Sequence, residues 1–165
     1  MSELPACSRR AALIGLVCTF GFIGFVFDGP ASAADAPTTD PALQAALSDY
    51  AQGNWDSAWF RLWSLACQGN ATAQFDLAQL YRLGRGIPAD PHLAFTWYEK
   101  AAGQGHGYAQ YNLAVMYEFG EGTPQDLAQA RAWYGRAAAQ NIAGSRAALQ
   151  RLDRKSTSSK ERASP

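Results

Sequence analysis

The chain has 165 residues, of which 17% are charged, and its 14 basic and 14 acidic side chains give a formal net charge of zero. This balance leaves no basic face of the kind that nucleic-acid binding requires, so we expect no nucleic-acid partner. Three cysteines are too few for a disulfide scaffold, and the fold must therefore rest on an apolar core.

The first 33 residues have the order of a secretory signal peptide. Arg9 and Arg10 precede an apolar run at residues 11–27, and the helix-breaking residues 28–30 lead to a small-residue site that ends at Ala33. We expect cleavage after Ala33 and a periplasmic or secreted location in a bacterium. The alternative is an uncleaved membrane anchor, because the run approaches the lower length limit for a span. The paired arginines leave both Sec and twin-arginine export open.

Residues 34–69 are predicted to hold an N-terminal segment and a degenerate helical hairpin, with helices over Pro41 to Cys67. Three tryptophans follow one another at i, i+4 and i+8 on its second helix: Trp55, Trp59 and Trp63. If this stripe is exposed, it is a second candidate interface. The alternative is that residues 41–47 fold over the rings as an N-terminal cap.

Residues 70–105 and 106–141 are two copies of one unit. Aligned without a gap, they are identical at 15 of 36 positions. Internal similarity at this period is typical of stacked helical hairpins. In the first helix of each copy, small and apolar residues recur at i, i+4, i+5 and i+8, which indicates one buried face. These residues are Ala73, Leu77, Ala78 and Tyr81, then Ala109, Leu113, Ala114 and Tyr117.

The loop inside each copy contains the signals of a chain reversal. Gly84 and Gly120 stand where the first helix ends and the chain turns with positive φ. Asp90 and Asp126 are placed to cap the second helix by accepting hydrogen bonds from its first free amides. The second helices, which reach Gln104 and Gln140, each carry a tryptophan that we expect to be buried between hairpins, namely Trp97 and Trp133.

The stretches "AQFDLAQLYRLGRGIPADPHLAFTWYEKAAGQG" and "AQYNLAVMYEFGEGTPQDLAQARAWYGRAAAQN" resemble the Sel-one-like repeat, a relative of the tetratricopeptide repeat. Ala78, Ala114 and Asn141 depart from the family pattern, which has glycine at these positions. The resemblance implies an all-α fold, a short right-handed αα solenoid of about seven helices. It also implies a non-enzymatic protein-interaction module of the cell envelope that binds a protein or peptide segment. The alternative is an envelope enzyme or a β-lactam-like small-molecule binder on the same scaffold.

The chain after the second copy is expected to close the stack. Residues 142–153 predict a single capping helix, because a terminal unit has nothing beyond it to bury against. Residues 154–165 are polar and lack apolar periodicity, and we expect them to form a disordered tail.

Helical-repeat solenoids line a concave surface with the first helix of each hairpin. The side of this helix opposite its small residues is therefore the candidate partner-binding site. It carries Phe75, Asp76, Gln79, Arg82, Tyr111, Asn112, Val115 and Glu118. Four of the polar members are expected to be exposed: Asp76, Arg82, Asn112 and Glu118. For Phe75 and Tyr111, packing between neighbouring repeats is an equal alternative.

Residues for catalysis, metal binding or cofactor binding are not recognised in the sequence. His92 and His106 fall at loop or helix-start positions without ligand-spaced partners, so we expect both to be solvated. If cleavage removes Cys7 and Cys18, Cys67 is the one thiol left. Its repeat equivalents are the small residues Gly103 and Ala139, which indicates a packing role.

Overall fold

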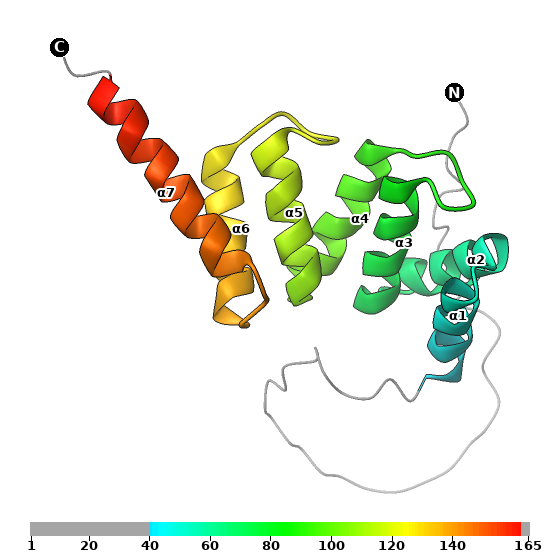
Figure 1. Ribbon diagram of the computed structural model, residues 1–165. Coiled ribbons are helices and arrows are strands. Elements are labelled where there is room, and N and C mark those ends of the chain that lie inside the picture. The colour runs from blue at the N-terminus through cyan, green and yellow to red at the C-terminus, as the bar shows by residue number, and fades with distance from the viewer. Residues whose placement is uncertain (1–39, 163–165) are drawn as a thin grey trace, which may run out of the picture. The chain divides into compact units, whose positions relative to one another are not determined.

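The computed structural model describes residues 40–162, and this part of the chain contains seven α-helices (Figure 1). They are α1 (Pro41–Ala51), α2 (Trp55–Cys67), α3 (Ala71–Leu83), α4 (Pro91–Gly103), α5 (Gly107–Phe119), α6 (Leu127–Ala139) and α7 (Ser145–Arg162). The predicted signal peptide, with its cleavage site after Ala33, lies outside the described residues.

The helices form hairpins that stack in chain order. The most extensive backbone contacts join consecutive helices, both within each hairpin and from one hairpin to the next. Between residues 40 and 162 no strand is present. The fold of this part is therefore the predicted all-α helical-repeat solenoid, in which α1, α3 and α5 are the first helices of three units and α2, α4 and α6 are the second.

The loop within each full repeat has the predicted conformation. Gly120 ends α5 in the left-handed region with a φ of 71°, and its amide donates to the Met116 carbonyl. The Asp126 carboxylate then accepts the amides of Ala128 and Gln129, which caps α6. Gly84 and Asp90 make the same arrangement one unit earlier. Asn141, which replaces the glycine at the end of the second copy, takes a φ of 59°.

The second glycine of each loop lies against the preceding unit. A Cβ atom on Gly122 would collide with the carbonyl group of Pro91, the first residue of α4. The same position one unit earlier, Gly86, lies equally close to Trp55 at the start of α2. These glycines therefore allow the loop of one unit to contact the second helix of the unit before it.

Buried amides lock the helix ends together in the two full repeats. The Gln74 side chain, on α3, donates to the Ala66 carbonyl at 3.0 Å and accepts from the Gln104 amide at 2.7 Å. Gln110 makes the equivalent pair of bonds to Ala102 and Gln140. Each glutamine therefore joins the ends of three consecutive helices, because its side chain has both a donor and an acceptor.

The core consists of small residues that let helices approach closely, together with large apolar side chains. Ala73, Leu77 and Ala78 on α3 are buried, as predicted, and Tyr98 on α4 has no exposed surface. Trp97 is buried, but its equivalent Trp133 is only partly buried. The prediction that both tryptophans are buried therefore holds for the first copy alone. Trp133 lies in the last hairpin, which packs against one further helix instead of a complete unit.

The last helix, α7, occupies the position of the first helix of a fourth unit. Arg131 on α6 forms an ion pair with Asp153 on α7, with a 3.0 Å separation between nitrogen and oxygen. The same two repeat positions meet one and two units earlier, as Phe95 against Tyr117 and Trp59 against Tyr81. In the described part, α7 thus packs on α6 through the same pair of repeat positions that joins α5 to α4 and α3 to α2.

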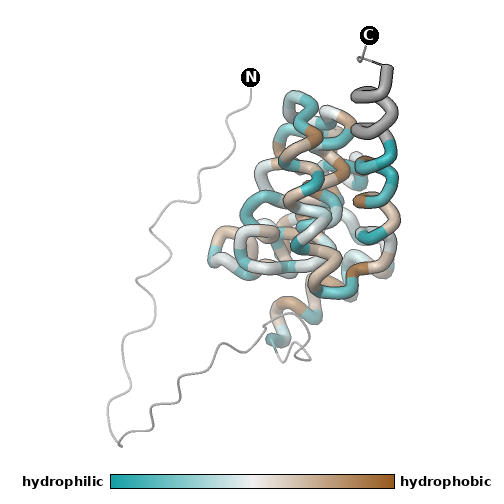
Figure 2. The backbone as a smooth tube through the Cα atoms, turned by 90° about the vertical axis from the view of Figure 1, so that its left-hand side faces the viewer, coloured by the Kyte–Doolittle hydropathy of each residue, from teal (hydrophilic) through white to brown (hydrophobic). Residues whose placement is uncertain are grey.

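The helix α7 continues to Arg162, well beyond the expected end near Leu152. Over residues 154–162 the structure therefore differs from the prediction of a disordered tail, and residues 163–165 of that prediction lie outside the described residues. The physical reason is that no glycine or proline interrupts residues 145–162, and a helix that packing has nucleated propagates at little cost. Figure 2 shows how polar and apolar stretches alternate along the helices. Within residues 40–162, no helix has the length and apolarity required to cross a membrane.

Candidate functional site

One face of α3 and α5 is left open by the neighbouring helices. Its positions follow the helical spacing i, i+4, i+7 and i+11. Large apolar side chains are exposed there: Leu83 by 52%, Phe119 by 64% and Tyr108 by 59%. We define the helix-A face by eight residues at equivalent positions in the two units: Thr72, Asp76, Gln79 and Leu83 on α3, and Tyr108, Asn112, Val115 and Phe119 on α5.

Half of the predicted binding residues belong to this face. They are Asp76, Gln79, Asn112 and Val115. The other half lie one step around the helix and make contacts with the next unit: Phe75, Arg82, Tyr111 and Glu118. Sequence reasoning placed the binding surface opposite the small residues and therefore missed Leu83, Tyr108 and Phe119. Leu83 and Phe119 occupy the same repeat position directly before the loop glycine, a pattern that marks an apolar residue outside the buried face.

The two aromatic residues Phe75 and Tyr111 pack between repeats, which was one of the two alternatives. The Phe75 ring stacks on the His106 ring with centroids 4.6 Å apart. The Tyr111 ring meets Tyr134 of α6, in its own unit, edge-on at 5.4 Å and lies against Gly144 in the turn before α7. Both rings therefore hold neighbouring elements together and are only partly exposed.

His106 is a half-buried structural residue, and the expectation that it is solvated is wrong. Its Nδ1 accepts the Ala109 amide at 3.2 Å and so caps α5. Burial lowers the pKa of His106, and the neutral ring is the form that can accept this bond. His92, in contrast, is exposed, and its Nδ1 lies 2.9 Å from the Gly122 carbonyl oxygen.

Arg82 and Glu121 form an ion pair between consecutive units. The guanidinium donates from Nε and Nη2 to the two carboxylate oxygens, each at 2.9 Å. Both side chains keep about a third of their surface exposed, 28% for Arg82 and 31% for Glu121. The pair joins α3 to the loop after α5, and bidentate geometry of this kind fixes the orientation of both groups.

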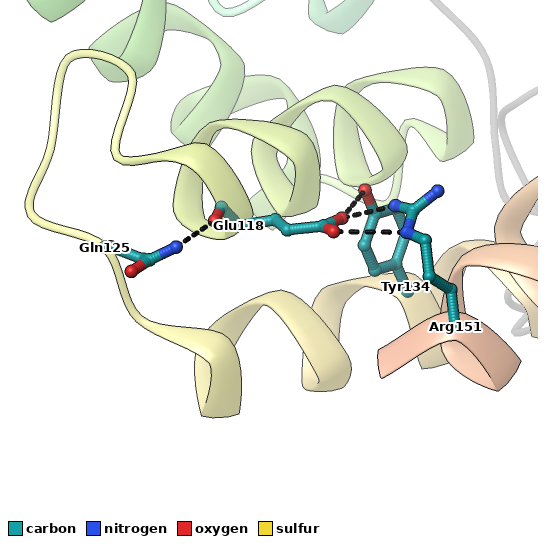
Figure 3. Close-up of polar contacts among 4 residues, drawn as sticks. All are labelled: Glu118, Gln125, Tyr134 and Arg151. Carbon is teal, nitrogen blue, oxygen red and sulfur yellow. Dashed lines mark hydrogen bonds and ion pairs between the residues drawn. The ribbon is translucent and has the colours of Figure 1, made fainter. Parts of the chain in front are cut away.

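Glu118 is buried, with 2% of its surface exposed, and the prediction that it is exposed is wrong. Figure 3 shows its carboxylate between two donors, the Arg151 guanidinium of α7 and the Tyr134 hydroxyl of α6. Arg151 donates at 2.6 and 3.2 Å, and Tyr134 at 3.0 Å. The backbone carbonyl of Glu118 also accepts from the Gln125 side chain. This cluster joins α5, α6 and α7, and no pattern in the sequence indicated the pairing because Arg151 lies outside the two full copies.

Asp76 is also buried, with 8% of its surface exposed, so the prediction that it is exposed is wrong as well. Its carboxylate accepts one weak hydrogen bond, from the Gln79 amide at 3.3 Å. Burial raises the pKa of Asp76 to about 7, and the Gln79 bond opposes this shift only in part. At this repeat position, the first full unit therefore carries an ionisable group, whereas the next unit carries the neutral Asn112.

The tryptophan stripe is half-buried in the contact between the first two units. Trp55 packs edge-on against Tyr50 of α1 and lies under the Arg85 guanidinium. Trp59 donates to the Tyr81 hydroxyl of α3 at 3.3 Å and stacks on Trp63. The stripe is therefore not an open interface, and its partners come from α3 and the following loop as well as from α1.

The described residues contain no group of three side chains suited to hold a metal ion. Cys67 is half-buried and packs against the apolar core, which agrees with the packing role expected from its repeat equivalents. The strongly shifted carboxyl of Asp76 has no histidine or basic residue in an ion pair with it among the described residues. Nothing in the described part favours the alternative of an enzyme or a β-lactam-like binder.

Comparisons with known proteins agree with this geometry. The model of the Sel1 repeat matches residues 71–106 and 107–142. Among solved structures, the chain is similar to a Sel1 repeat protein from Oxalobacter formigenes, with 33% identity and a TM-score of 0.63 over 66% of this chain and 45% of that one. It is also similar to a protective antigen with an SLR fold from uropathogenic Escherichia coli, with 25% identity and a TM-score of 0.65 over 69% of this chain and 25% of that one.

Cysteine-rich protein B of Helicobacter pylori shares the fold at 16% identity, with a TM-score of 0.55 over 66% of this chain and 92% of that one. None of the curated proteins searched matches the chain. The described part is thus an all-α repeat solenoid with an open helix-A face. Residues 71–142 thus contain two Sel1 repeats, and proteins with such repeats are generally protein-interaction modules. The chain spans less than half the length of the Oxalobacter and Escherichia relatives.

Proposed function

We propose that this protein is a non-enzymatic adaptor or regulator that binds a segment of a partner protein on the helix-A face. The observation that carries the proposal is the exposure of large apolar side chains at repeated positions of this face, above all Leu83 and Phe119. Exposed apolar residues that gather on one face are characteristic of interaction sites. A solenoid is suited to this role because its packing places equivalent residues of successive units side by side.

We further propose that the protein acts in the bacterial cell envelope, as a periplasmic or secreted component. The support is the order of residues 1–33, in which a pair of arginines, an apolar run and a small-residue site follow one another. Cell fractionation followed by intact-mass measurement tests this part. The expected species is soluble and begins at Ala34, and recovery of the full-length chain only from membranes would contradict it.

The binding proposal is tested by affinity capture from envelope extract with identification by mass spectrometry. The test variant carries Leu83→Ser and Phe119→Ser, and the matched control is Phe60→Ser, because Phe60 is equally exposed but lies on α2. We expect at least one protein that wild type and control retain and the double variant loses. Retention of the same proteins by all three would mean that the helix-A face is not the binding surface.

A further inference from the structure

The described residues contain two buried carboxylates, and only one of them has a cationic partner. Glu118 is held by the Arg151 guanidinium and the Tyr134 hydroxyl. Asp76 has one hydrogen bond, from the neutral amide of Gln79. A carboxylate offers about four acceptor sites, so most of the bonding capacity of Asp76 is unused. An ionised carboxylate in such a place is costly unless a cation accompanies it.

The basic residues nearby are already engaged. Arg82, on the same helix as Asp76, is paired with Glu121, and Arg85 lies over the Tyr50 and Trp55 rings. Further ion pairs in the described part join Arg61 to Asp49, Arg131 to Asp153 and Arg151 to Glu118. Residues 34–150 also contain ten acidic and seven basic side chains, a surplus of three acidic residues. The body of the protein therefore favours a cationic ligand electrostatically.

Asp76 reaches the helix-A face with 8% of its surface exposed, so a bound segment can approach its carboxylate from that face. Asp76 lies on the helix-A face between Thr72 and Gln79, both of which are partly exposed, and Leu83 follows at i+7 with half of its surface open. The equivalent position one unit later is the neutral Asn112. The face therefore carries a largely buried carboxyl at one unit and a neutral amide at the next, and each unit also carries an exposed apolar side chain, Leu83 or Phe119.

We infer that Asp76 is a specificity-determining residue that accepts a lysine or arginine side chain of the partner segment, while Leu83 and Phe119 accept apolar side chains of the same segment. This inference rests on the proposed function. The partner is thus a segment in which a basic residue lies near apolar ones. Its cation replaces the missing charge partner of Asp76, and truncating one partner of such a desolvated pair strongly weakens binding.

Selection from a random dodecapeptide library displayed on phage tests the inference, with the immobilised protein as bait. Three baits are compared: wild type, Asp76→Asn and the Leu83→Ser, Phe119→Ser double variant. The asparagine variant keeps the shape of the side chain and copies Asn112, and circular dichroism checks its fold. We expect wild type to select peptides that combine lysine or arginine with apolar residues, and the Asp76→Asn variant to select apolar peptides without the basic preference.

Fluorescence anisotropy on one selected peptide gives the second readout. Replacing its basic residue by glutamine is expected to weaken binding to wild type about tenfold and to leave binding to Asp76→Asn unchanged. Selected peptides that lack basic residues, or that bind both proteins equally, would overturn the inference while leaving the proposed function intact. If no selected peptide depends on Leu83 and Phe119, the proposed function itself fails.

Discussion

At the scale of single residues, the structure separates groups that look alike in the sequence. Asp76 and Asn112 hold the same repeat position, yet only Asp76 is ionisable, and burial raises the pKa of its carboxyl to about 7 from 3.8. Glu118 holds the repeat position of Arg82, but Glu118 is buried and Arg82 is partly exposed. Equivalent positions in the two repeats therefore differ in burial, because the side chains that pack on them come from the next unit and are different in each case.

The first prediction concerns the Asp76→Asn variant. A raised folded-state pKa means that the native protein binds more protons than the unfolded chain between about pH 3.8 and 7, so ionisation of Asp76 costs stability progressively as pH rises. At about 1.4 kcal/mol per pKa unit, the variant should be more stable than wild type at pH 8 by up to about 4 kcal/mol. Urea unfolding at pH 4.5 should show a much smaller difference. Equal differences at both pH values would contradict the burial of an ionisable group.

The second prediction concerns the cap of α5. Because burial lowers the pKa of His106, its contribution to stability is present above the usual histidine value of about 6.5 and declines as pH falls below it. His106→Asn should keep the cap, as Asn70 does for α3, and remove the acid sensitivity. Thermal unfolding should therefore show the variant within about 1 kcal/mol of wild type at pH 8. At pH 5 the difference should move in favour of the variant, and a constant difference would count against the cap assignment.

At the scale of elements, glycines and ion pairs decide how one unit meets the next. Gly122→Ala places a Cβ against the Pro91 carbonyl at a φ of 68° and should cost about 1–3 kcal/mol in urea unfolding. Gly103→Ala is the matched control, because a Cβ there meets nothing within 4 Å and Gly103 lies in α4. The control should be neutral or up to about 1 kcal/mol stabilising. Equal effects of the two changes would refute the close approach of the loop to α4.

The attachment of α7 gives a further prediction. Arg151→Met leaves the buried Glu118 carboxylate with Tyr134 but without its cation, so we expect a loss of about 2 kcal/mol or more in chemical unfolding. Arg131→Met removes an ion pair from the same α6–α7 contact, but both of its side chains are largely exposed, so the loss should stay below about 1 kcal/mol. A larger loss for Arg131 than for Arg151 would contradict the role given to the Glu118 cluster.

At the scale of the whole molecule, the sequence predicted the helical hairpins, their loops and their caps, because these depend on local chemistry that repeats every unit. Gly120 and Asp126 are examples whose conformation follows from residue type alone. The face that remains open could not be predicted with the same accuracy. It depends on how far each helix turns toward the next unit. Glu118 was therefore predicted to be exposed although it is buried, and the sequence left open whether Phe75 and Tyr111 pack between repeats.

The length of α7 could also not be predicted from the local sequence pattern. The sequence of residues 154–162 has no apolar period that would predict a buried helix face. These residues are helical because they extend a helix whose first half is already packed. The Glu118 cluster could likewise not be predicted from the local sequence pattern. Its partner Arg151 lies outside the repeated units, so no comparison of one copy with the other pointed to it.

The central claim is that partner segments bind on the helix-A face. Its most direct test is a nuclear magnetic resonance titration of the isotope-labelled protein with a peptide selected from the library, followed through backbone amide shifts. We expect the largest shifts along Thr72 to Leu83 and Tyr108 to Phe119, with the exposed side of α4 and α6 little changed. Shifts concentrated on α4 and α6, or on the tryptophan stripe of α2, would show that the open face of α3 and α5 is not where this protein binds its partners.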